Sequence, residues 1–62
     1  MEKVISNNIY EKINYARKIS TAYPNESFEV SKEAYSLALK NNLKIEAGYS
    51  LVSMAFSARA NS

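Results

Sequence analysis

The side chains of this 62-residue chain that could take part in chemistry are mainly glutamates, tyrosines and serines. The chain has no histidine and no cysteine, so it lacks both the usual general base near neutral pH and a thiol nucleophile. Glu29 and Glu33 are one helical turn apart and could share a proton as acid and base. Carboxylates at this spacing are far more often solvated groups on a helix surface. We therefore expect no enzymatic activity.

Cofactor and metal sites are also disfavoured. The only glycine is Gly48, which rules out a glycine-rich phosphate loop. Without His or Cys a zinc site has no typical ligands. The carboxylates are scattered along the chain at Glu2, Glu11, Glu26, Glu29, Glu33 and Glu46. We expect neither a cofactor nor a metal ion.

Nucleic-acid binding is the alternative function. Residues 39–52 can be aligned with a helix-turn-helix, in which the third predicted helix would read the DNA. A recognition helix needs Arg, Lys, Asn or Gln at base edges. Between Lys44 and Arg59 this helix offers only serines, Tyr49 and Glu46 as polar groups. The net charge is only +2 and the basic residues are scattered, so we do not expect a nucleic-acid partner.

Length and composition predict one small helical domain or fragment, residues 1–62. A chain of this size buries only about 60% of the surface that it exposes when unfolded, and it has no disulfide or zinc to compensate. The N-terminus lacks the apolar segment of a secretory signal. The longest charge-free apolar run, residues 47–58, is shorter than the roughly 20 residues that span a bilayer. We expect a soluble cytoplasmic protein with no membrane association.

The first predicted helix covers residues 3–22. Its apolar residues recur every three or four positions, which is the spacing of one helix face. They are Ile5, Ile9, Ile13, Ala16, Ile19 and Tyr23. Pro24 ends this helix, because proline disfavours a helical conformation at the preceding residue and lacks an amide hydrogen. Asn25 is the predicted N-cap of the next helix.

The second and third helices are predicted at residues 26–41 and 45–59. The second has an inner face of small side chains, which would let another helix approach closely: Ser27, Ser31, Ala34 and Ala38. Asn41-Asn42 ends it, because asparagine tolerates the left-handed cap conformation. The third helix is apolar on nearly every side, except for a polar line of Glu46, Ser50, Ser53 and Ser57. Three helices with short connections predict an all-α fold of three antiparallel helices.

Residues 27–58 resemble the tetratricopeptide repeat, especially its looser form in bacterial signalling and regulatory proteins. That family has a second helix ending in Ala-Leu-x-x-Ala, a short polar turn, and a first helix carrying Leu-x-x-Leu-Gly-x-x-Tyr. In this chain the first motif is matched by Ala34, Tyr35 and Ala38, and the second by Leu51, Met54, Ala55 and Ala58. About one and a half degenerate repeats fit, so the expected architecture is either a helical-repeat-like stack, as the resemblance implies, or a small three-helix bundle.

The resemblance implies a non-catalytic protein–protein interaction module, a scaffold or regulatory piece of a larger signalling protein that binds a protein or peptide. Family members hold such ligands on the inner face of first helices, which here would include Asn7, Asn14, Glu46, Ser50 and Ser53. Tyrosine is common at interfaces, and Tyr10 and Tyr15 are the tyrosines that we expect to be exposed. Of Met54 and Phe56, Phe56 is the one expected to meet a partner. The predicted partner-binding residues are Tyr10, Asn14, Tyr49, Ser50, Ser53 and Phe56.

The third helix lacks a helix to pair with in this arrangement. Repeat arrays usually need about three repeats to be stable. A helix that is apolar on most sides needs neighbours on more than one face. We therefore expect that the chain forms a homo-oligomer or that it packs against the remainder of a longer chain.

Overall fold

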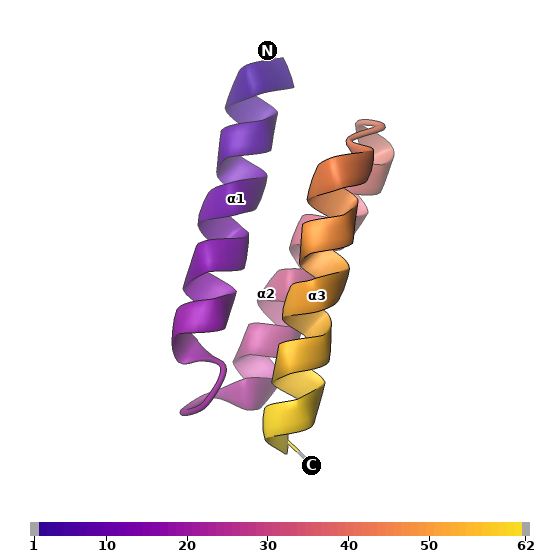
Figure 1. Ribbon diagram of the computed structural model, residues 1–62. Coiled ribbons are helices and arrows are strands. Elements are labelled where there is room, and N and C mark those ends of the chain that lie inside the picture. Colours follow the sequence, from indigo (N-terminus) through magenta and orange to yellow (C-terminus); the bar gives the residue numbers. More distant parts are fainter. Residues whose placement is uncertain (1, 62) are drawn as a thin grey trace.

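The computed structural model contains three antiparallel helices: α1 (Glu2–Ile19), α2 (Pro24–Lys40) and α3 (Lys44–Asn61). It describes the backbone of residues 2–61 and the side chains of residues 3–59. The helices form an elongated bundle of about 35 × 15 × 13 Å. Its two ends are formed by the start of α1 with the α2–α3 turn, and by the α1–α2 turn with the end of α3 (Figure 1). The all-α, three-helix prediction is confirmed.

The apolar stripe of α1 faces the other two helices. Ile9, Ile13 and Ala16 are buried, and Ile5 packs at the margin of the same cluster. The stripe ends earlier than predicted, because α1 stops at Ile19 and Tyr23 is 62% exposed in the following turn. Ile9 and Ile13 are the only large apolar side chains among the buried residues that the structure describes.

Proline, rather than a capping side chain, begins α2. Pro24 is the first helical residue, where its fixed φ suits the helix and its missing N–H is not needed. Tyr23 occupies the N-cap position without a side-chain hydrogen bond, and its carbonyl accepts from the Ser27 amide at 2.9 Å. The prediction of Asn25 as the N-cap is therefore wrong: the helix already includes Asn25.

The turn between α2 and α3 matches the prediction that Asn41-Asn42 ends the second helix. Asn42 has a φ of 57°, the left-handed conformation in which asparagine is tolerated. The Leu43 amide donates to the Ala38 carbonyl at 2.8 Å, and the Asn42 amide donates to the Leu39 carbonyl at 3.2 Å. This pair of bonds is a Schellman motif, which satisfies carbonyls that the helix itself leaves unpaired. Leu43 then packs against the apolar cluster.

Small side chains form the contact between α2 and α3, which is the most extensive of the bundle. The small inner face predicted for α2 is confirmed, because all four of its residues are buried. The two serines of this face contact serines of α3: the hydroxyls of Ser27 and Ser57 are 2.5 Å apart, and those of Ser31 and Ser53 are 2.7 Å apart. These two contacts fix an antiparallel register. We call Ser27, Ser31, Ser53 and Ser57 the serine ladder.

The serine ladder extends to α1 through Ser27. The Ser27 hydroxyl donates to the Ala16 carbonyl at 2.5 Å. Ala16 is within the last four residues of α1, where carbonyls have no partner inside the helix. The Ser57 hydroxyl can donate to the Ser53 carbonyl at 3.0 Å. Because each serine has one hydroxyl hydrogen, Ser27 and Ser57 share two hydrogens among three contacts, and either hydroxyl can be the donor between them. Ser27 therefore contacts both neighbouring helices.

The orientation of α3 differs from the one that its composition suggests. The serines of its polar line are buried, with Ser50 and Ser53 at 0% and 1% exposure. Most of its large apolar side chains are exposed instead. The reason is the fit to α2: only small side chains of α3 can lie against the small face of α2 at the distance of a hydroxyl–hydroxyl contact.

Removing the Ser27 hydroxyl tests this packing. We expect Ser27→Ala to lower the free energy of unfolding by about 1–3 kcal/mol, because a buried carbonyl and a buried hydroxyl lose a partner. Ser36→Ala is the matched control on the exposed side of the same helix, with an expected change within about 0.5 kcal/mol. Urea unfolding followed by circular dichroism measures both. Equal effects of the two substitutions would contradict the role of the ladder.

Candidate protein interface

The side of α3 opposite its buried serines is apolar and open to solvent. We call it the outer face of α3 and define it by Ile45, Gly48, Tyr49, Val52, Ala55, Phe56 and Arg59, all of which are exposed. Ile45 is 71% exposed and Val52 is 48% exposed. Five of the ten large apolar side chains that are exposed in the described part of the chain belong to α3. Contiguous exposed apolar surface of this kind marks interaction sites in soluble proteins.

The spacing of these residues is that of a helix-packing seam. Ile45, Tyr49, Val52, Phe56 and Arg59 follow one another at intervals of four, three, four and three. This repeat of seven places side chains along one line, as in a coiled coil. The outer face therefore has the residue pattern of a surface that packs against another helix.

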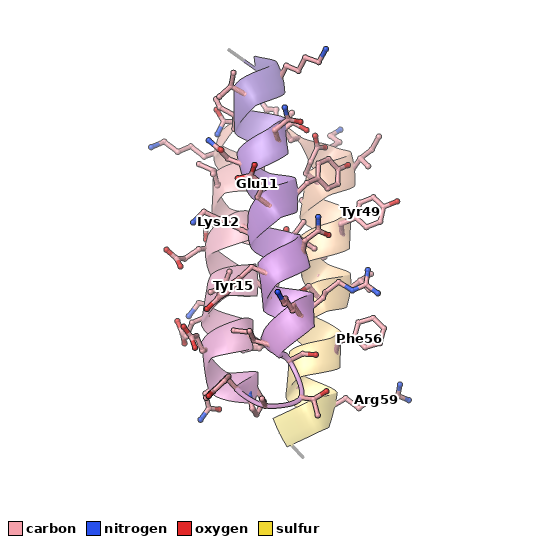
Figure 2. All side chains as sticks on the ribbon, turned by 90° about the vertical axis from the view of Figure 1, so that its left-hand side faces the viewer. Glu11, Lys12, Tyr15, Tyr49, Phe56 and Arg59 are labelled. Atoms are coloured by element: carbon pink, nitrogen blue, oxygen red, sulfur yellow. The ribbon has the colours of Figure 1, made fainter. Side chains whose placement is uncertain are left out.

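Small residues beside the seam make the outer face uneven. Gly48 and Ala55 are seven residues apart, and a side chain added at Gly48 would meet nothing within 4 Å. A shallow hollow of about 260 Å³ is lined by Val52, Ala55, Phe56 and Arg59. Figure 2 shows Tyr49, Phe56 and Arg59 along the same side of the bundle, on α3. Gly48 and Ala55 are therefore low points of the outer face.

One edge of the outer face is fixed by contacts with α1. The rings of Tyr10 and Tyr49 meet edge to face, with centroids 5.7 Å apart. The Arg17 guanidinium lies 5.2 Å from the centroid of the Phe56 ring, within the range of a cation–π interaction. These contacts hold the two aromatic rings of the seam at the α1–α3 boundary, where they stay available on their outward sides.

Glu46 begins the buried side of α3 and links it to the start of α1. Its carboxylate accepts a hydrogen bond from the Ser6 hydroxyl at 2.5 Å. Partial burial, the negative charge of Glu46 and the neighbouring Tyr49 raise the pKa of Tyr10 above its ordinary value of 10.0. The neutral phenol of Tyr10 is thus the form that this environment favours.

The predicted partner-binding residues divide into two groups. Tyr49 and Phe56 are exposed on the outer face, Asn14 is exposed on α1, and Tyr10 is half-buried beside Tyr49. Ser50 and Ser53 are buried between the helices, where Ser50 donates to the Glu46 carbonyl at 2.9 Å. They are not accessible to a partner in this fold, which corrects their assignment. The expected ligand face of Asn7, Asn14, Glu46, Ser50 and Ser53 therefore does not form a continuous surface.

Several residues of the outer face were missed because the serines of α3 were treated as its polar, outward line. The missed residues are Ile45, Gly48, Val52, Ala55 and Arg59. The signal that identifies them is the seam spacing, read together with the match between the serines of α3 and those of α2. The exposed apolar positions of α3 lie on the side that this match leaves free.

A second, polar surface lies between α1 and α2. Two open hollows of about 500 and 530 Å³ share Lys12 and Leu37 in their lining. Glu29 and Glu33 belong to this surface and are exposed, as expected of solvated carboxylates. Figure 2 shows Glu11, Lys12 and Tyr15 on this side, away from Tyr49 and Phe56. Acidic and basic side chains are thus mixed on this surface.

The described side chains contain no group of three or more His, Cys, Asp or Glu residues that could hold a metal ion. The side chain of Glu2 is outside that part of the chain. Among the described residues, no helix has the length and apolar character needed to cross a membrane. In comparisons with known proteins, no family model, no curated protein and no solved structure matches this chain.

The raised pKa of Tyr10 predicts a loss of stability in alkali. Above pH 10 the unfolded chain gives up the Tyr10 proton more readily than the folded chain. The stability linked to Tyr10 is therefore present below its ordinary pKa of 10.0 and lost as the pH rises through the higher folded value.

We expect Tyr10→Phe to lose less stability than the wild type between about pH 9 and pH 11. Tyr23→Phe is the control, because Tyr23 is largely exposed. Urea unfolding at each pH measures the slopes, and a Tyr10→Phe slope equal to that of Tyr23→Phe would contradict the assignment.

Proposed function

We propose that this chain is a non-catalytic protein–protein interaction module that binds a helix of its partner on the outer face of α3. The observation that carries the proposal is the orientation of α3, whose small serines are buried and whose large apolar side chains are exposed. No charged residue occurs from Ala47 to Ala58. Apart from the phenol of Tyr49, such a surface offers contact area and shape but no groups for acid–base or nucleophilic chemistry.

The resemblance to the tetratricopeptide repeat supports the same function. In such arrays each helix pair leaves an apolar face that the next helix covers. On this resemblance α3 corresponds to a first helix, and most of its outer face is exposed in the described part of the chain. We accordingly propose a cytoplasmic scaffold or regulatory role, as a piece of a signalling protein.

The helix-turn-helix alternative has less support from the geometry. As a recognition helix, α3 would present Tyr49, Val52 and Phe56 to the DNA, and its serines are buried. Arg59 is the only basic residue of the outer face. Base edges are read mainly by Arg, Lys, Asn and Gln, so this helix lacks the side chains for sequence-specific contact. Binding to a DNA duplex that weakens steeply with added salt would favour the alternative.

Photo-crosslinking in the cells that produce the protein tests the proposed interface. A benzoylphenylalanine placed at position 56 is expected to form adducts with protein, and the added substitution Val52→Glu should abolish them. The same group at position 36, on the exposed side of α2, is the control and should give none. Helicity of the Val52→Glu variant should match that of the wild type, since the side chain is exposed. Adducts that persist with Val52→Glu, or none at position 56, would contradict the proposal.

A further inference from the structure

We infer that the outer face of α3 binds the same face of a second copy of this chain, with the two α3 helices antiparallel across a two-fold axis near Val52. This inference rests on the proposed function and names the partner. Its first support is the seam of Ile45, Tyr49, Val52 and Phe56, whose spacing fits a facing helix with the same spacing.

The absence of charge restricts the partner. Residues 47–58 contain no ionisable side chain except the phenol of Tyr49. A partner that placed a charged group here would bury it without a counter-charge, which is strongly unfavourable. The facing surface must therefore be an uncharged apolar helix face. In the described part of the chain, α3 itself is the helix whose exposed side has this character.

The outer face of α3 can meet its own copy along both of its edges in an antiparallel pair. A two-fold axis at Val52, perpendicular to both helices, sets each edge of the face against the same edge of the other copy. Phe56 then comes level with the partner subunit's Tyr49 on the aromatic edge, and Ala55 comes level with the partner subunit's Gly48 on the edge of small residues. The small residues let the two helices approach each other there, and Gly48 has open space above it. A contact between two copies across such an axis is self-complementary by symmetry.

The ends of the helices are also compatible with an antiparallel arrangement. The positive N-terminal end of one α3 helix lies beside the negative C-terminal end of the other. Arg59, in the last turn of one copy, comes to the end of the pair where Lys44 of the partner subunit begins its helix, and both are exposed there. Glu46 lies on the buried side of α3, where it accepts from Ser6, and takes no part in this contact. A parallel pair would instead bring like dipoles together.

Self-association would also bury apolar surface that the single chain leaves exposed. The large apolar side chains that the fold buries completely are few, and half of the exposed ones lie on α3. Small domains without disulfides or metals often gain the missing burial by oligomerisation. A standard interface covers about 800 Å² on each partner, which is about 18% of the 4404 Å² surface of this chain.

Light scattering of the purified chain from about 1 μM to about 1 mM is the first test, and we expect a dimer at the upper end. Val52→Glu should raise the dissociation constant at least about 100-fold, because two carboxylates would be buried face to face. Val52→Lys should do the same. A mixture of the two variants should recover the dimer, since position 52 of one copy faces position 52 of the other.

Single-cysteine variants determine the direction, and the chain has no cysteine of its own. V52C should form an intermolecular disulfide under mild oxidation. I45C should not, because the two thiols would be about 21 Å apart along the antiparallel pair, at about 1.5 Å per residue, far beyond disulfide reach. An I45C self-crosslink as fast as that of V52C would overturn the antiparallel arrangement.

A chain that stays monomeric up to about 1 mM, or a dimer that V52E leaves unchanged, would overturn the inference. The outcomes for the proposed function are distinct from those for this inference. If the adducts at position 56 contain a different protein while the purified chain is monomeric, the proposed interface is supported and the second copy is not its partner.

Discussion

The hydroxyl of Ser27 is the point on which the arrangement of the three helices depends. It donates to the last turn of α1 and contacts Ser57 on α3, while the Ser27 carbonyl accepts from Ser31 at 2.8 Å. In the part of the chain that the structure describes, no buried side-chain polar atom lacks a partner. A polar interior is stable only under this condition, because an unpaired buried group costs more free energy than a typical hydrogen bond gains. The ladder thus determines which side of α3 is inside.

This constraint has a consequence for the surface. Small side chains allow the helices to approach, but they bury little apolar area at about 25 cal/mol per Å². The larger apolar residues of α3 cannot enter that narrow contact, so they lie outside. The same feature that gives the bundle its register therefore produces an uncovered apolar face. The buried serines and the exposed apolar residues lie on different sides of one helix.

Much of the fold could be predicted from the sequence, because its signals are local. The stripe of α1, the small face of α2 and the Asn41-Asn42 turn each follow from spacing and residue type. Pro24 was identified as a break, but its preference for the first helical position placed the start of α2 before Asn25.

The orientation of α3 could not be predicted from hydropathy alone. Its apolar residues surround most of the helix, so the apolar pattern does not select one side. Which side of α3 is buried depends on Ser27 and Ser31, which are more than 20 residues away from their α3 partners in the chain. Tyr49 and Phe56 are exposed on α3, as a partner-binding role would need, whereas Ser50 and Ser53 were misplaced because serine is usually a surface residue.

The central claim is that α3 packs through its serines and exposes its apolar face. Thiol labelling of the variants S53C and V52C, in samples dilute enough to be monomeric, measures this most directly. The account predicts fast labelling of V52C and strong protection of S53C, with protection lost on addition of urea. Protection of V52C together with fast labelling of S53C would show that α3 packs through its apolar side, and it would contradict the account.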